Sequence, residues 1–147
     1  MEFFEVLDIS GDAGIRVFGK DLKELFVNAA LGMFSLITDL KDVEEKEEIN
    51  ISVEGRTMEG TLVSWLNELI FRFDTYGFIV KNIIIAEFLS GKDQSEGEAY
   101  TFTASISGEQ FDSERHKGKL LIKAATYHKL TIEKKGSLWR VEVIFDI

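Results

Sequence analysis

The sequence places an aspartate, Asp12, between two glycines in the stretch ISGDAG, residues 9–14. Glycine lets the backbone take a positive φ angle or approach another group closely, so this stretch is typical of a tight turn between two strands. An aspartate in such a turn can simply accept a hydrogen bond from its own backbone. The alternative is that the Asp12 carboxylate is held out to bind a cation or another charged group. The local sequence leaves both interpretations open.

The end of the chain carries two more anionic groups, the Asp146 side chain and the α-carboxylate of Ile147. Penultimate residues are usually frayed, but the alternating apolar residues over 139–145 predict a strand that is ordered to its end. Two adjacent anions on a rigid strand repel each other unless a positive charge lies nearby. If the first strands pair with this last strand, Asp12 reaches the same place. Three carboxylates would suit a hard divalent cation such as Ca²⁺ or Mg²⁺.

Five other side chains could do chemistry. Lys123 and His128 lie at the two ends of the stretch KAATYH, whereas Glu109, Asp112 and His116 lie in SGEQFDSERH. Each also has a structural interpretation: a solvated lysine on a strand, a histidine that is exposed or hydrogen-bonded, and acidic residues in a turn. Zinc is a weaker candidate than a hard cation, because the chain has no cysteine and two histidines.

Two amphipathic helices must position these residues. The first is predicted over 21–39, where Asp21 and Glu24 have the spacing of a capping box and apolar residues recur every three or four positions. The second is predicted over 58–76 and ends at Gly77, the expected C-terminal cap.

The rest of the chain predicts short strands joined by turns. These strands are expected over 3–8, 15–18, 48–54, 78–89, 99–107, 120–126, 129–133 and 138–145, with a hairpin turn at 134–137. Most connections are too short for parallel crossovers, so the pairing should be antiparallel. We expect an α+β fold in which two helices pack on one face of a mostly antiparallel sheet, as a single two-layer domain spanning 1–147.

Composition excludes several classes of protein. At 147 residues and 45% hydrophobic content the chain can build a core, and no apolar run approaches the roughly 20 residues that span a membrane. The start of the chain lacks the features of a secretory signal, and there is no cysteine for a disulfide framework. We therefore expect a cytoplasmic protein with no membrane partner. A phosphate-binding glycine loop, a GxSxG motif, an HExxH motif and a thiol nucleophile are all absent.

Charge is unevenly distributed along the chain. The net charge is −9, which opposes general binding to a phosphate backbone. Residues 1–75 carry all of this excess, while residues 115–135 hold seven basic side chains and one acidic one. The acidic residues concentrate over 39–48. Such runs are either solvated surface or features that orient a charged partner.

Taken together, these stretches resemble the archease family along essentially the whole chain. ISGD followed by GIRVFG is similar to the family's first turn and strand, and DLKELFVNAALGMF and WLNELIF are similar to its two helices. GEQFDSERH and KAATYH are the most specific matches, and the chain stops on the family's Asp-Ile. The order and spacing of these stretches make the combined resemblance specific.

The resemblance implies an accessory protein of the RtcB-type RNA ligase, without catalytic residues of its own, that supports guanylylation and multiple turnover in tRNA splicing. It implies a metal site formed by Asp12, Asp146 and Ile147, holding a divalent cation, Ca²⁺ before Mg²⁺ or Mn²⁺. It also implies that Lys123 takes part in ligase activation and that RNA is met only through the ligase. One departure matters: Ile9 stands where the family's turn has a histidine, so any role of that imidazole is in doubt here.

Two other functions compete with this interpretation. The basic segment 115–135 would also suit a chaperone-like binding module that modulates nucleic-acid enzymes. A metal-dependent phosphoester hydrolase using Asp12, Asp146 and His128 is a further alternative, although no nucleophile is evident in the sequence. Turnover by the isolated protein with added metal would distinguish the hydrolase from the other two.

Overall fold

The computed structural model describes residues 3–92 and 98–147. The elements in these ranges, in chain order, are β1 (Phe4–Leu7), β2 (Ala13–Gly19), α1 (Leu22–Ile37), a short 3₁₀ turn η1 (Leu40–Asp42), β3 (Glu47–Gly55), α2 (Met58–Tyr76), β4 (Phe78–Lys92), β5 (Glu98–Gln110), β6 (Ala124–Ala125), β7 (Glu133–Lys135) and β8 (Leu138–Asp146). Both predicted helices and most predicted strands are therefore found close to their expected bounds.

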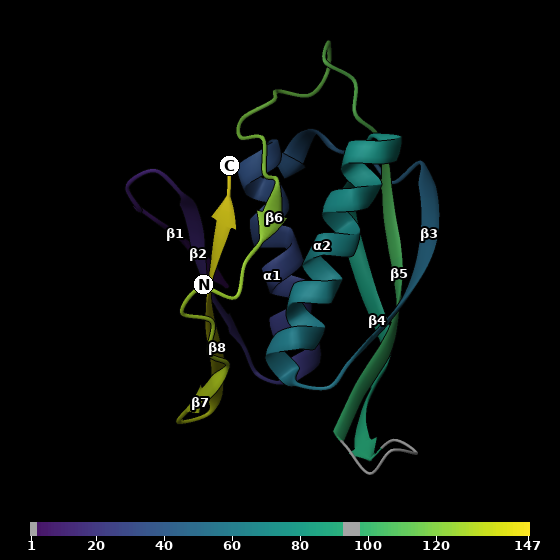
Figure 1. Ribbon diagram of the computed structural model, residues 1–147. Helices are drawn as coiled ribbons and strands as arrows, with labels where there is room; N and C mark the ends of the chain where they lie inside the picture. Colours follow the sequence, from purple (N-terminus) through teal and green to yellow (C-terminus); the bar gives the residue numbers. More distant parts are fainter. Residues whose placement is uncertain (1–2, 93–97) are drawn as a thin grey trace.

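The described strands form two sheets in which every pair is antiparallel. One has the order β1-β2-β8-β6, with β7 also paired to β8, and the other has the order β3-β5-β4. In Figure 1 the helices stand between the two sheets; α1 contacts β2 and β4, and α2 contacts β3 and β6. The α+β class with two helices and antiparallel pairing is confirmed. The strands are, however, divided between two sheets, because each helix presents apolar residues to both sides.

Both helices begin and end as their sequences predict. The Asp21 side chain accepts a hydrogen bond from the Glu24 backbone N–H at 2.8 Å and opens α1. Thr57 does the same for α2 through the Gly60 N–H at 2.8 Å. Gly77 ends α2 with a φ angle of 71°, the left-handed conformation expected of a C-terminal glycine cap.

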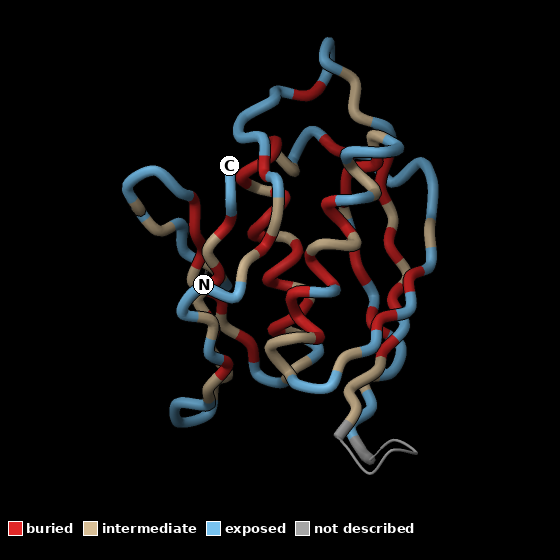
Figure 2. The backbone as a smooth tube through the Cα atoms, in the orientation of Figure 1, coloured by how far each residue is buried: buried red, intermediate tan, exposed pale blue. Residues whose placement is uncertain are grey.

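The core joins both helices and both sheets in one cluster of buried residues. The Trp65 side chain of α2 is fully buried and its indole N–H donates to the Phe26 carbonyl of α1 at 3.0 Å. The Phe102 ring of β5 packs edge-on against the rings of Phe26 and Trp65. Figure 2 shows that buried residues are concentrated in the two helices and in parts of the strands, while most turns are exposed.

Two predicted strands are much shorter or absent. The strand expected over 120–126 is reduced to β6, because the backbone N–H groups of Lys119 and Leu120 donate instead to carbonyls at the C-terminal end of α1. The strand expected over 129–133 is replaced by a turn, in which Lys129 has a φ angle of 53° and the Ile132 N–H donates to the Glu59 side chain. The predicted hairpin turn is present, and Lys135 pairs with Leu138 across it.

Candidate functional site

Pairing of β2 with β8 brings Asp12 and Asp146 to the same end of the sheet. Ala13 lies opposite Phe145 in the antiparallel register, and the two aspartates are the neighbours of this pair in the chain. Ala13 and Phe145 are buried. Because successive side chains of a strand alternate between faces, the Asp146 side chain of β8 is directed to the opposite, solvent side of the sheet. Asp12 and Asp146 are both exposed.

The turn before Asp12 has the geometry expected from its glycines. Gly11 has a φ angle of 80°, and the Asp12 N–H donates to the Ile9 carbonyl at 3.3 Å. Within the described residues the Asp12 carboxylate has no hydrogen-bond or ion-pair partner. The side chain therefore does not stabilise its own turn by bonding the backbone, which was the simpler interpretation of the stretch.

Lys123 and Ile147 reach the same end of the sheet. Ala124 of β6 lies opposite Asp146, and the Lys123 N–H donates to the Asp146 carbonyl at 2.8 Å. Figure 1 shows the end of the chain beside β6. Asp146 thus lies between the strand that follows Asp12 and the segment that carries Lys123. We refer to Asp12, Lys123, Asp146 and Ile147, all exposed, as the tip.

The groups of the tip that could bind a metal ion are all carboxylates. The two aspartates and the terminal carboxylate are the ligand type that Ca²⁺ and Mg²⁺ prefer. The Asp12 and Asp146 side chains have no cationic side chain paired with them in the described residues. Among residues 3–92 and 98–147, no three His, Cys, Asp or Glu side chains gather as a metal site would. A cation at the tip would therefore depend on the terminal carboxylate as its third protein ligand.

His128 shares a hollow with Asp12 on the outer face of the β1–β2–β8 sheet. The hollow has a volume of about 350 Å³. It is lined by Leu7, Asp8, Ile9, Asp12, Arg16, His128, Lys129, Glu142 and Ile144. His128 is exposed, so of the two interpretations the sequence allowed, the structure supports a surface position that adjoins the tip.

Glu109 and His116 form a buried ion cluster with Arg115. The Glu109 carboxylate accepts both guanidinium N–H groups of Arg115, at 2.7 and 2.9 Å, and the Glu44 backbone N–H at 2.7 Å. The Arg115 hydrogen bonds lower the pKa of the Glu109 carboxyl despite its burial. His116 Nε2 lies 3.1 Å from the same carboxylate, and its Nδ1 accepts the Asp112 N–H at 2.9 Å, so Nε2 is the donor.

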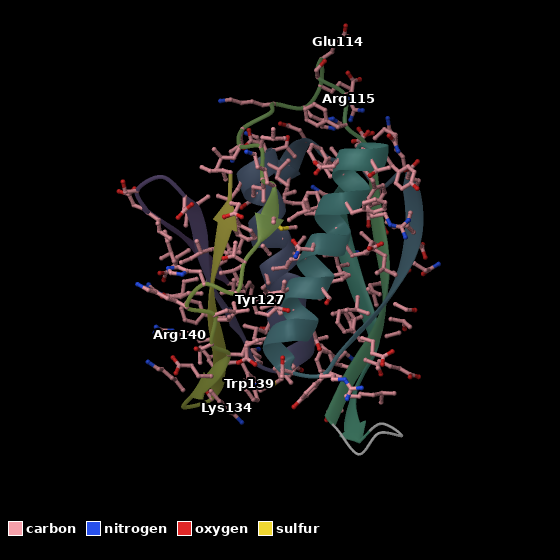
Figure 3. All side chains as sticks on the ribbon, viewed as in Figure 1. Glu114, Arg115, Tyr127, Lys134, Trp139 and Arg140 are labelled. Carbon is pink, nitrogen blue, oxygen red and sulfur yellow. The ribbon has the colours of Figure 1, made fainter. Side chains whose placement is uncertain are left out.

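This cluster fixes the start of the long segment between β5 and β6. The Asp112 side chain accepts the Glu114 N–H at 3.0 Å, and its carbonyl accepts the His116 N–H at 2.7 Å. Glu114 and Arg115 are labelled on this segment in Figure 3. Glu109, Asp112 and His116 therefore have structural partners, and none of them lines the hollow or belongs to the tip.

Three charged side chains that take part in these contacts were missed in the sequence. Residue spacing gave no signal for the pair formed by Arg16 and Glu142, whose side chains meet at 3.2 Å only because β2 pairs with β8. Hydrogen bonds to Glu142 and then to Glu5 raise the pKa of Arg16. Arg115 was present in the conspicuous GEQFDSERH stretch, and an acid six residues before an arginine was the signal that could have found it.

Neither of the helices in the described part of the chain is long and apolar enough to cross a membrane.

Comparisons of the sequence with a family model and with known proteins all match one family. The Archease protein family model matches residues 4–147. The chain is 34% identical over 148 residues to the protein archease of Pyrococcus furiosus and 32% identical over 147 residues to that of Sulfurisphaera tokodaii, covering the full length of both chains in each case.

Solved structures agree with this family. The solution structure of Methanobacterium thermoautotrophicum protein 1598 matches with a TM-score of 0.76 and 33% identity, covering both chains completely. The crystal structure of an archease from Thermotoga maritima, described as a possible chaperone, has a TM-score of 0.60 at 20% identity over 96% of this chain and 94% of that one, and supports the fold alone. From its sequence and its fold, the chain belongs to the archease family.

Proposed function

We propose that this protein activates an RtcB-type RNA ligase, supporting its guanylylation and its multiple turnover in tRNA splicing or RNA repair. The observation that carries the proposal is the tip, where Asp12, Asp146 and Lys123 are exposed at one end of a sheet although they are far apart in sequence. Membership of the archease family supports it, because the resemblance to that family implies a role for these three residues.

The tip is also the proposed metal site. Asp12, Asp146 and the α-carboxylate of Ile147 would hold a divalent cation, Ca²⁺ first and Mg²⁺ or Mn²⁺ as alternatives, since all three ligands are carboxylates. A cation bound there would supply positive charge to phosphate or carboxylate oxygens of the ligase active site. The exposure of both aspartates supports such an approach by a partner.

Lys123 would act on the same partner by charge. Its side chain is exposed and has no carboxylate partner among the described residues, so it can offset a phosphate or carboxylate of the ligase complex. The tip could activate the ligase in a second way, by stabilising its competent conformation. This would shift the conformational equilibrium of the ligase without contact between the tip and the reacting groups. RNA would then be contacted only through the ligase.

A chaperone-like binding module is the second candidate. The Thermotoga maritima archease is described as a possible chaperone, and here the apolar side chains of Leu121 and Ile147, 66% and 42% exposed, lie near Lys123. Such a module would suppress the aggregation of unrelated proteins without any need for Asp12 or Asp146. The hydrolase alternative would require turnover of an RNA phosphoester by the protein alone with added metal.

Multiple-turnover RNA ligation tests the proposal. A cognate RtcB-type ligase is assayed with excess RNA, GTP and divalent metal, with and without a catalytic amount of this protein. We expect a single turnover without the protein and sustained turnover with it. Equal product in both reactions would contradict the proposal, and so would an equal gain from an inert protein such as albumin.

A further inference from the structure

The hollow beside the tip has an apolar lining formed around Gly14 of β2. A Cβ atom on Gly14 would lie 2.6 Å from the Ile9 Cδ1 and 3.6 Å from the Leu7 Cβ, so these side chains occupy the space above the glycine. Ile144 of β8 lies opposite Gly14 in the register. Leu7, Ile9 and Ile144 thus contribute apolar side chains to the lining of the hollow, on which a flat ring could pack.

The charged groups around this surface are of two kinds. Arg16 is paired with Glu142 at 3.2 Å and with Glu5 at 3.0 Å, so its positive charge is engaged by two carboxylates and this group keeps one negative charge in excess. In contrast, the side chains of Asp8, Asp12, His128 and Lys129 are exposed and have no partner among the described residues. The hollow thus offers two free carboxylate acceptors from the β1–β2 connection and free donors from the turn after β6.

Lys129 is held in a conformation that side chains rarely adopt. Its φ angle of 53° is the only positive value among the non-glycine residues of the described chain. The turn is closed by the Leu130 N–H, which donates to the Tyr127 carbonyl at 3.1 Å, and by the His128 N–H, which donates to the Thr126 hydroxyl at 3.3 Å. Tyr127, which opens this turn, is labelled in Figure 3. Residues under such backbone strain cluster at ligand sites, and this one lines the hollow.

The geometry points to the hollow as a binding site for a nucleotide. Its volume of about 350 Å³ lies at the lower end of the range for small-molecule sites. The base would pack on Leu7, Ile9 and Ile144, with an amino group of the base donating to the Asp8 carboxylate. The phosphate would be bound by Lys129 and the His128 ring N–H, both of which can donate to it.

Calorimetric titration of the intact protein with four probes tests this assignment. AMP carries the ring, the amine and the phosphate together, whereas adenosine, ribose 5-phosphate and inorganic phosphate each lack at least one of them. We expect AMP to bind with one-to-one stoichiometry and each fragment to bind at least about tenfold more weakly. No heat of binding with AMP at about 1 mM would overturn the assignment. Equal affinity for AMP and inorganic phosphate would also overturn it, because the site would then be an anion site without base recognition.

Two variants locate the site. Lys129→Gly removes the cation at a position whose φ angle suits glycine, so the fold should be kept. We expect this variant to lower AMP affinity about tenfold. The control Lys117→Gln, which changes an exposed lysine outside the hollow, should leave AMP affinity unchanged. Asp8→Ala should weaken AMP about tenfold and leave ribose 5-phosphate unchanged. AMP binding that is insensitive to both substitutions would place the nucleotide elsewhere and contradict the proposal.

Nucleotide binding in the hollow goes beyond ligase activation and is tested without a ligase. A negative titration therefore leaves the proposed function intact, and a failure of the ligation assay leaves the titration meaningful.

Discussion

Replacing Glu109 by glutamine tests whether the buried cluster holds the segment between β5 and β6. One carboxylate oxygen faces Arg115 at 2.7 Å and Lys46 Nζ at 3.5 Å. The other faces Arg115 at 2.9 Å, the Glu44 N–H at 2.7 Å and His116 Nε2 at 3.1 Å, so both oxygens face donors only. The NH₂ group of a glutamine must occupy one of these two positions. In either orientation a donor then faces donors, and the carboxylate charge is lost.

The expected cost follows from these contacts. The Glu109 side chain is only 3% exposed, whereas that of Arg115 is 38% exposed, so the lost ion pair is discounted for screening by water. The larger part of the loss in stability comes from buried donors left without an acceptor, which cost about 1–3 kcal/mol each. We expect Glu109→Gln to lower the free energy of unfolding by about 2–4 kcal/mol at pH 7, which corresponds to roughly 10 °C in Tm for a chain of this size.

The pH dependence of this loss has a defined sign. Hydrogen bonds from Arg115 lower the pKa of Glu109, so its contribution to stability is complete above the unfolded-state pKa of about 4.3 and decreases as pH falls toward the folded-state pKa. The difference between wild type and variant should therefore be constant between pH 6 and 8, within about 0.5 kcal/mol, and shrink below about pH 4.

Urea unfolding followed by tryptophan fluorescence measures both quantities, with Glu114→Gln as the matched control because that acid is exposed on the same segment. A Glu109→Gln variant as stable as this control at pH 7 would show that the cluster does not hold the segment. A difference that grows on acidification would contradict the assigned charge state of Glu109.

Three further predictions concern the tip and α2. Asp12→Asn and Asp146→Asn should each weaken Ca²⁺ binding by at least about tenfold in calorimetric titration, since each removes one of few charged ligands; unchanged affinity would exclude them as ligands. Lys123→Ala should reduce ligase stimulation without lowering Ca²⁺ affinity, and a loss of both would give the lysine a structural role. Gly77→Ala should lower the free energy of unfolding by about 1 kcal/mol, because φ is 71° there; an unchanged urea midpoint would contradict this.

Local sequence signals predicted the helices and their ends well. The predicted caps Asp21 and Gly77 act through contacts within five residues, and such contacts can be recognised without knowing the fold. The cap at Thr57 is equally local but was not predicted. The division of strands into two sheets could not be predicted in this way, because pairing partners such as Ile15 and Val143 are distant in sequence. The same limit explains why Arg16 and Glu142 were missed.

The position of the tip residues could be predicted from the sequence better than that of Glu109. Alternation along the last strand correctly predicted an ordered Asp146 and led to the expectation that Asp12 would lie near it. The prediction that Glu109 lies in a turn was wrong, because β5 continues to Gln110 and includes it. Its burial could not be predicted either, since it depends on Arg115 and on the backbone of Glu44 from another part of the chain. Short-range patterns therefore identified the residues, and long-range pairing determined their partners.

The role of the tip is best tested by counting ligation events per RtcB-type ligase molecule in the presence of this protein or of its Asp146→Asn variant. The matched control is Asp74→Asn, an exposed aspartate near the end of α2. If the tip activates the ligase, wild type and the control should sustain repeated turnover, whereas Asp146→Asn should leave the ligase close to one turnover. Full stimulation by folded Asp146→Asn protein would contradict activation through the tip.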